Sequence, residues 1–153
     1  GAAEVLGLDI SGEAVRLATR NAELIGFTDC AFQEANVFDF LTDAARTGKQ
    51  WDAIVLDPPA FAKSKSAMEN AYRGYKEINL RALKCLPPGG ILVTCSCSQH
   101  MSPRMFRQMV DEAARDAGRR LRELNDGGQP PDHPVLWGVP ESRYLKCLTL
   151  QAC

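Results

Sequence analysis

Short apolar segments alternate with longer segments of helical period along most of the sequence, and this alternation constrains the fold more than any other feature. Residues 4–10 (EVLGLDI) form an apolar run that ends in an acid, and Ser11 is then a typical cap for the helix that follows. Residues 30–35 predict a second strand and residues 37–47 a second helix. Strands that alternate with helices are typical of an α/β fold with a doubly wound, mostly parallel, Rossmann-like sheet.

The second half of the sequence continues this pattern. Residues 51–57 (WDAIVLD) are nearly all apolar and run into Pro58 and Pro59, which must end a strand because proline donates no ladder hydrogen bond. We expect helices over 68–86 and 105–117, and strands over 91–95, 120–124 and 144–150. Ligands of such sheets bind beyond the carboxyl ends of the strands. Four residues are expected there: Asp9, Asn36, Asp57 and Cys97.

Length and composition fit one soluble domain. The chain has 153 residues, of which 45% are hydrophobic and 24% charged. No apolar stretch approaches the roughly 20 residues of a membrane span, and no signal-peptide pattern opens the sequence, so we expect a cytoplasmic protein without membrane contact. The net charge of −1 gives no global indication of nucleic-acid binding. Residues 63–84 are locally basic, which a solvated helix face would also explain.

The six cysteines do not have the spacing of a disulfide framework, and most lie in apolar, strand-like runs. Buried free thiols are therefore the simplest interpretation. Cys95 and Cys97 form a C-x-C pair with His100 nearby, which is too few ligands for zinc. We expect no metal site.

Five sequence motifs resemble a known family. They read DPPAFAKSK, YRGYKEIN, PPGGILVTCSCS, DHPV and YLK, in this order over nearly the whole chain. They resemble class I S-adenosylmethionine-dependent methyltransferases, and more narrowly the large-subunit ribosomal RNA cytosine-carbon-5 methyltransferases, whose members usually carry an amino-terminal PUA domain. The resemblance implies an enzyme that methylates a cytosine of ribosomal RNA and takes the methyl group from S-adenosylmethionine.

The resemblance also implies a covalent mechanism. Carbon 5 of cytosine is a poor nucleophile, so a thiolate adds to carbon 6 and creates an enamine that can attack the methyl group. Cys97 stands in the second S-C-S position of the family and is the expected nucleophile, while Asp57 would bind the cytosine edge near ring nitrogen 3. Cys95 is the rival because residues two apart on a strand face the same side. Cys97 is preferred because it lies nearer the open end of the strand and is flanked by the hydroxyl side chains of Ser96 and Ser98. For both cysteines, an inert thiol in the core remains an alternative.

We expect Asp57 and four other residues to form the cofactor site. Asp9, followed by Ile10, would accept hydrogen bonds from the ribose hydroxyls, and Asn36 would meet the adenine amino group while Val37 packs on the ring. A helix cap explains Asp9 equally well, and an ordinary turn explains Asn36. The family would have an aspartate at the position of Asn36, although an amide oxygen can still accept a hydrogen bond.

The RNA is expected to meet residues of the Asp-Pro-Pro loop and of the following helix. These substrate-binding candidates are Pro58, Pro59, Phe61, Lys63 and Arg73. An aromatic ring would stack on a base and the cations, with Lys76, would bind phosphates. We expect a structural role for His133. Ala60 stands where many RNA cytosine methyltransferases have a second cysteine, which favours a mechanism with one cysteine and leaves the base for the carbon-5 proton unassigned.

The sequence starts at what we expect to be the second strand of the class. The first strand, its glycine-rich loop and an RNA-binding domain would precede Gly1, so residues 1–153 are expected to be a single truncated catalytic domain. By itself it should bind the cofactor weakly and be inactive, and its exposed sheet edges could allow self-association. Two other functions stay open: a methyltransferase that acts on nitrogen or on a non-RNA substrate, and a non-catalytic RNA-binding module.

Overall fold

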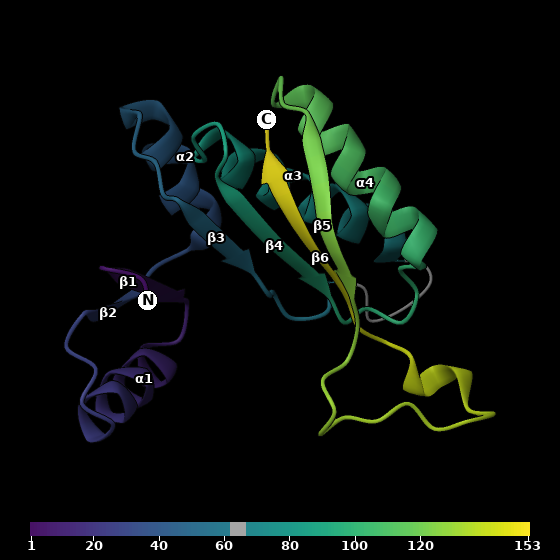
Figure 1. Cartoon of the computed structure of the whole chain (residues 1–153), viewed down its shortest axis with the longest axis horizontal. Helices are drawn as coiled ribbons and strands as arrows, with labels where there is room; N and C mark the ends of the chain where they lie inside the picture. The colour runs from purple at the N-terminus through teal and green to yellow at the C-terminus, as the bar shows by residue number, and fades with distance from the viewer. Residues whose placement is uncertain (62–66) are drawn as a thin grey trace. The chain divides into compact units, whose positions relative to one another are not determined.

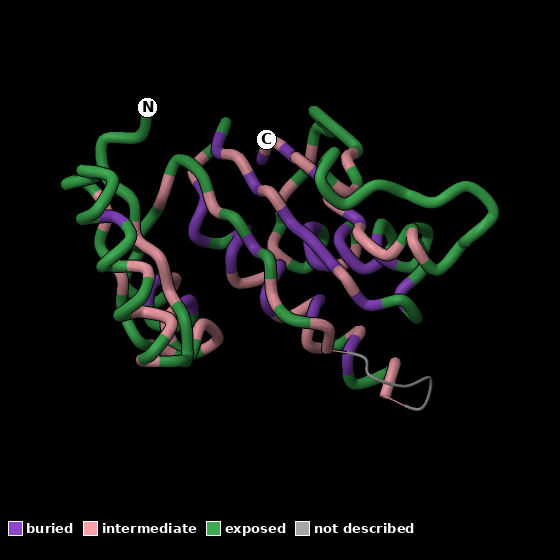
Figure 2. Tube along the Cα trace, turned by 90° about the horizontal axis from the view of Figure 1, so that it is seen from below, coloured by how far each residue is buried: buried purple, intermediate pink, exposed green. Residues whose placement is uncertain are grey.

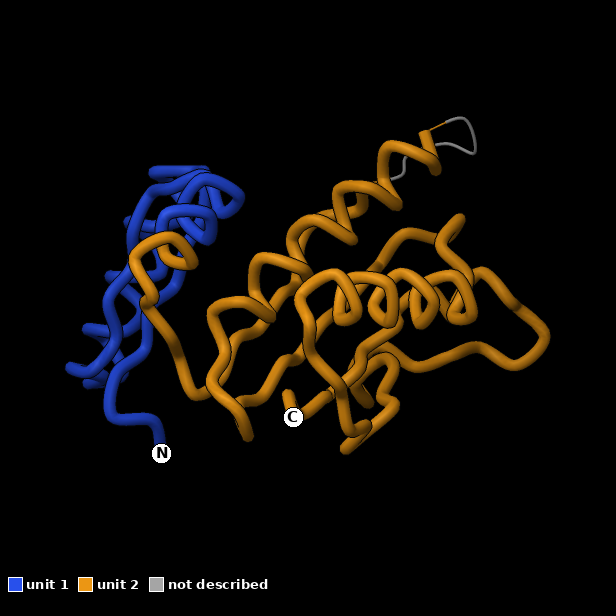
Figure 3. The backbone as a smooth tube through the Cα atoms, turned by 90° about the horizontal axis from the view of Figure 1, so that it is seen from above, with its two compact units in different colours: residues 1–43 blue, residues 44–153 orange. Residues whose placement is uncertain are grey.

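The computed structural model describes residues 1–61 and 67–153, which form two compact units (Figure 3). Unit 1 comprises residues 1–43 and unit 2 residues 44–153. The boundary falls inside one helix, so each unit is described by itself. No helix within the described residues is long and apolar enough to cross a membrane.

Unit 1 is built on a parallel pair of strands. Strand β1 (Val5–Asp9) lies beside β2 (Cys30–Glu34) in register from Val5 opposite Cys30 to Asp9 opposite Glu34. Helix α1 (Gly12–Leu24) connects them, and the Oγ of Ser11 caps its first turn. Because the two strands end level with each other, the residues that follow them emerge at one edge of this sheet.

Unit 2 contains a four-stranded mixed sheet with the strand order β3-β4-β6-β5 (Figure 1). Its elements are β3 (Ala53–Leu56), α3 (Met68–Lys84), β4 (Ile91–Ser96), α4 (Pro103–Asp116), β5 (Leu121–Gly127), the 3-10 turn η2 (Pro140–Ser142) and β6 (Lys146–Ala152). Strands β3 and β4 are parallel, whereas β6 runs antiparallel to both β4 and β5. A loop rather than a crossover helix joins β5 to β6, which is why β6 returns in the opposite direction. The predicted α/β class is confirmed, and the parallel arrangement holds for β1–β2 and β3–β4.

The core of unit 2 lies between its sheet and helices α3 and α4. Side chains such as Tyr75, Leu83, Leu92 and Phe106 are almost completely buried there. Figure 2 shows this buried zone beside a long exposed loop, which contains the segment 128–143. Burial of each such side chain stabilises the fold by about 1.5–3 kcal/mol relative to an exposed position, which makes this layer the main support of the strand ends.

The element boundaries mostly match the sequence prediction. Helix α2 (Val37–Thr47) has both predicted ends, because the side chain of Asn36 caps it and Gly48 follows with a φ of 72°. Helix α4 starts earlier than predicted, at Pro103, since Ser102 accepts a hydrogen bond from a backbone N–H of its first turn. Proline at this first position needs no hydrogen-bond partner, so the helix can include it.

Candidate functional site

Asp57 and Cys97 follow neighbouring parallel strands of unit 2 and emerge at the same edge of its sheet. Leu56, the last residue of β3, pairs with Thr94 of β4, so the chain leaves β3 at the level where β4 is about to end. The side chain of Asp57 is exposed and accepts no hydrogen bond from residues that the structure describes. Cys97 is half-buried and comes directly after Ser96, the end of β4. The predicted pair is therefore brought to one edge by the parallel pairing.

Cys95 is in a different environment from Cys97. Cys95 is only 7% exposed and lies opposite Cys147 of β6. Burial, with a hydrogen bond to Cys147 and the nearby charge of Asp57, raises the pKa of Cys95 to about 12. Because the thiolate is the nucleophilic form, Cys95 stays protonated and unreactive near neutral pH. The environment thus favours Cys97 as the reactive thiol at this edge.

The turn that carries Cys97 is held from two sides. The hydroxyl of Tyr75 on α3 lies 3.0 Å from the Oγ of buried Ser98. From β6, the Nζ of Lys146 donates a hydrogen bond of 2.7 Å to the carbonyl oxygen of Ser98. The same carbonyl accepts the N–H of Met101 at 3.1 Å. Cys97 is therefore placed by a fixed turn rather than by a free loop.

Phe61 packs on helix α3. Its ring centroid lies 4.5 Å from that of Tyr75, and a Cβ at Gly74 would come within 3.3 Å of the Phe61 ring. Gly74 therefore leaves room for the aromatic ring. Pro58 is half-buried and Pro59 exposed in the segment between Asp57 and Phe61. The stacking of Phe61 on RNA stays a prediction, and the observed contacts give the ring a structural role.

The cations expected to meet RNA differ in their surroundings. Lys63 lies outside the described residues. Arg73 is exposed and forms an ion pair with Glu69 one turn earlier on α3. Lys76 pairs with Asp116 at 2.9 Å and with a second carboxylate of α4, so it joins the two helices. These ion pairs give Lys76 a structural role between the two helices. Its contact with RNA phosphates stays a prediction.

The cofactor candidates of unit 1 gather at the edge where β1 and β2 end. The Oδ1 of Asp9 accepts the N–H of Ser11 at 2.7 Å, and the Oδ1 of Asn36 accepts the N–H of the residue two positions later at 2.9 Å. Ser11 rather than Asp9 caps α1, so the bond of Asp9 is a turn contact, and Asn36 leads directly into α2 as the alternative of an ordinary turn expected. Ile10, which is exposed, and the half-buried Val37 follow these two residues directly. Unit 1 therefore presents all four candidates at one edge.

Two residues at the edge of unit 2 were missed as site candidates. Lys146 is only 8% exposed although it is a lysine. A charge at the start of an otherwise apolar strand was a signal that could have found it. Trp137 is 98% exposed in the loop between β5 and β6. Since Ser96 pairs with Lys146 at the start of β6, this loop leaves the sheet at the same edge as Cys97. An exposed tryptophan beside such an edge is an unusual surface feature.

His133 lies in the same loop. It is exposed, its Nδ1 is 3.3 Å from Asp132, and its backbone donates to Pro130 and accepts from Gln129. These contacts shape the loop, as a structural role would require. Among the described residues, no group of three or more histidine, cysteine or acidic side chains is arranged to hold a metal ion.

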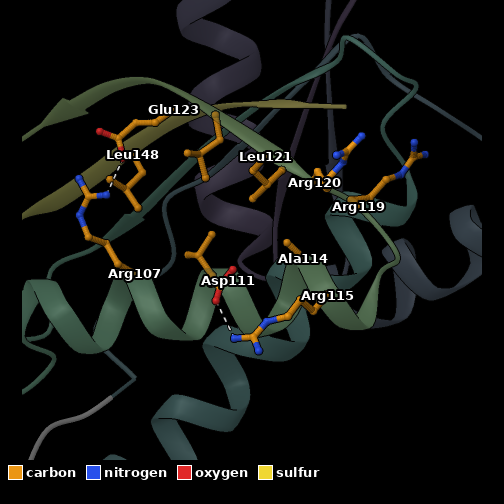
Figure 4. Close-up of a pocket in the computed structure, with 11 residues that line it drawn as sticks. Arg107, Asp111, Ala114, Arg115, Arg119, Arg120, Leu121, Glu123 and Leu148 are labelled. Carbon is orange, nitrogen blue, oxygen red and sulfur yellow. Dashed lines mark hydrogen bonds and ion pairs between the residues drawn. The ribbon is translucent and has the colours of Figure 1, made fainter.

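A cleft of about 400 Å³ lies away from this edge, between α4 and β5 (Figure 4). Two ion pairs are formed by residues that line the cleft, one between Arg107 and Glu123 and one between Arg115 and Asp111. None of the predicted site residues lines it. Arg107 and Arg115 are paired with carboxylates, and the strand ends, where the predicted residues lie, remain the candidate site.

Comparison with known proteins decides the family. A family model described as "Methyltransferase domain" matches residues 1–128. The chain belongs to this methyltransferase family. Its fold is that of class I, S-adenosylmethionine-dependent methyltransferases, which solved structures share. A candidate methyltransferase from Streptococcus mutans has a TM-score of 0.83 at 21% sequence identity. The match covers 99% of this chain and 39% of the Streptococcus mutans chain. NSun6 from Pyrococcus horikoshii, solved with SFG, has a TM-score of 0.71 at 21% identity, over 97% of this chain and 41% of its own.

Curated relatives are closer in sequence. The proteins named Ribosomal RNA large subunit methyltransferase I from Tolumonas auensis and from Aeromonas salmonicida are each 44% identical over 99% of this chain. The match covers 39% of each relative. The chain therefore spans about two fifths of the length of these relatives.

Proposed function

We propose that the protein methylates carbon 5 of a cytosine in large-subunit ribosomal RNA through a covalent bond to Cys97. The observation that carries the proposal is the shared edge of Asp57 and Cys97, where the competing thiol of Cys95 is kept protonated. The names of the curated relatives support ribosomal RNA as the substrate. The proposal includes a PUA domain as a further RNA-binding part of the complete protein.

The residues at the edge of unit 1 fit an adenosine cofactor. One carboxylate oxygen of Asp9 accepts a backbone hydrogen bond, which leaves the other oxygen for ribose hydroxyls. The amide oxygen of Asn36 has a second lone pair beyond the one used in its cap, and it could accept from an adenine amino group. Ile10 and Val37 supply apolar surface beside them. When bound, S-adenosylmethionine would supply an electrophilic methyl group.

Each protein group has one task in the proposed reaction. The Cys97 thiolate forms a bond from Sγ to carbon 6, and the electron pair of the carbon 5–carbon 6 double bond becomes available at carbon 5 for the methyl group. Asp57 binds the cytosine edge at ring nitrogen 3 and favours its protonation as charge builds. Loss of the carbon-5 proton, which we assign to water, restores the double bond and releases the thiolate.

Replacement of each thiol in the full-length protein tests the proposal. With Cys97→Ser, turnover on cytosine-containing ribosomal RNA should fall at least about 10³-fold, because a hydroxyl is a much poorer nucleophile at neutral pH. Cys95→Ser is the matched control and should keep turnover within about tenfold. Turnover retained by Cys97→Ser would instead support methylation of nitrogen or of another acceptor. Inactive but RNA-binding wild-type protein would support the non-catalytic module.

A further inference from the structure

Lys146 is a buried cation that has no carboxylate partner in the part of the chain that the structure describes. It opens β6 opposite Ser96 and is 8% exposed. Its Nζ donates to two carbonyl oxygens, those of Ser98 and Tyr144, each at 2.7 Å. No carboxylate among the described residues lies within ion-pair distance of it. Two carbonyl dipoles compensate only part of the cost of burying an ammonium group, so this position needs a further explanation.

Among the described residues, Cys97 is the group whose negative charge would act on Lys146. Burial lowers the pKa of Lys146, and the interaction of its ammonium group with Cys97 opposes that effect. The titratable groups that act on Cys95 are Cys147, Asp57 and Cys97. Burial and the neighbouring Cys147 and Asp57 keep Cys95 protonated. Cys95 therefore does not supply the negative charge.

We propose that Lys146 is a positioning residue for the methyl transfer: it fixes the turn at Ser98 and serves as the counter-charge of the Cys97 thiolate. The inference rests on the proposed function, because it gives Cys97 a thiolate to stabilise. Lys146 keeps its three protons throughout. The proton of the Cys97 thiol passes to solvent, and the thiolate that remains pairs with the ammonium group until the bond from Sγ to carbon 6 forms.

Site-resolved alkylation of the full-length protein tests this without RNA or methyl donor. Iodoacetamide reacts with thiolates, and digestion followed by mass spectrometry gives the rate at Cys97 separately, with the exposed Cys153 as an internal reference. Lys146→Met should slow the reaction of Cys97 about tenfold at pH 7, and Lys146→Arg should stay within about threefold of wild type because it keeps the charge. The rate at Cys153 should not change.

The pH dependence separates a charge effect from a structural one. If Lys146 stabilises the thiolate, the difference between Lys146→Met and wild type shrinks as pH rises, because strongly alkaline pH deprotonates a thiol without help from a neighbouring cation. Tyr75→Phe is the second variant, because it loosens the same turn from α3 without removing a charge, and it should alter the rate by no more than about threefold. Equal rates for Lys146→Met and wild type at pH 7, or a ratio that is the same at every pH, would overturn the inference.

The outcomes also separate this inference from the proposed function. Turnover by Cys97→Ser would refute the covalent mechanism whatever the alkylation shows. A pH-independent alkylation ratio would refute the role of Lys146 and leave the covalent mechanism standing. Should Lys146→Met fold poorly, Lys146→Gln replaces it, because its amide can still donate hydrogen bonds but carries no charge. The charge model predicts the same slower, pH-dependent reaction of Cys97 for Lys146→Gln, and a rate equal to wild type at pH 7 would overturn it.

Discussion

Replacement of Tyr75 by phenylalanine removes a single hydrogen bond from the centre of unit 2. Tyr75 is fully buried, and its ring centroid lies 4.5 Å from that of Phe61 and 6.3 Å from that of Phe106. Phenylalanine keeps both ring contacts. Only the hydroxyl is lost, which lies 3.0 Å from the Oγ of Ser98.

The expected cost follows from that one contact. A hydrogen bond contributes about 0.5–1.5 kcal/mol net, and leaving the buried Ser98 hydroxyl with one partner fewer adds to the loss. Tyr75→Phe should therefore lower the free energy of unfolding by about 1–2 kcal/mol. Urea denaturation followed by circular dichroism measures this, and a double-mutant cycle with Ser98→Ala should give a coupling energy of about 1 kcal/mol.

Tyr144→Phe is the matched control for this prediction. Tyr144 is half-buried, and its hydroxyl forms no hydrogen bond with residues that the structure describes. Removal of that hydroxyl should therefore change the free energy of unfolding by less than about 0.5 kcal/mol. The reasoning would be refuted if Tyr75→Phe were as stable as Tyr144→Phe. Additive effects of Tyr75→Phe and Ser98→Ala would refute the pairing of the two hydroxyls.

Three further predictions concern other parts of the chain. Because the pKa of Cys95 is raised from 9.0 to about 12, the unfolded chain binds fewer protons than the folded chain between these two pH values. The free energy of unfolding should therefore fall as pH rises through this range. Urea titrations should show a shallower fall for Cys95→Ala than for wild type. Arg107→Met removes two partly exposed ion pairs to β5, so it should cost no more than about 1 kcal/mol and lose most of that effect in 1 M salt. Under the proposed function, Trp137→Ala should weaken the binding of single-stranded RNA by the full-length protein about 5- to 100-fold, because one stacking contact is lost. Trp51→Phe is the control and should keep the affinity of wild type. Equal RNA affinities of Trp137→Ala and wild type in a titration would exclude the stacking role.

The sequence predicted features that depend on neighbouring residues. Helix α2 was predicted with both ends, and its stop at Gly48 is a local signal. The cap at Asn36 is local as well, although from the sequence that residue was interpreted as a turn or a cofactor contact. The shared edge of Asp57 and Cys97 was also predictable, since strands joined by a crossover helix run parallel and their carboxyl ends coincide. These signals are readable without knowledge of tertiary contacts.

Features that depend on distant residues were not predictable in this way. The pairing of Lys76 with α4 depends on how two helices pack, and the helical period alone does not choose the partner face. The contacts of Ser98 with Tyr75 and Lys146 join residues from α3, β4 and β6. The protonated state of Cys95 likewise depends on Cys147, which lies across the sheet and far away in sequence.

The central claim is that Cys97 becomes covalently bound to the substrate cytosine. RNA that contains 5-fluorocytosine blocks the final loss of the carbon-5 substituent and so traps such a bond. Full-length protein incubated with this RNA and S-adenosylmethionine, then digested and analysed by mass spectrometry, should carry the nucleotide on the peptide that contains Cys97. Cys95→Ser should form the same adduct and Cys97→Ser none. An adduct on Cys95, or methylation of cytosine RNA by a protein that forms no adduct, would contradict the claim.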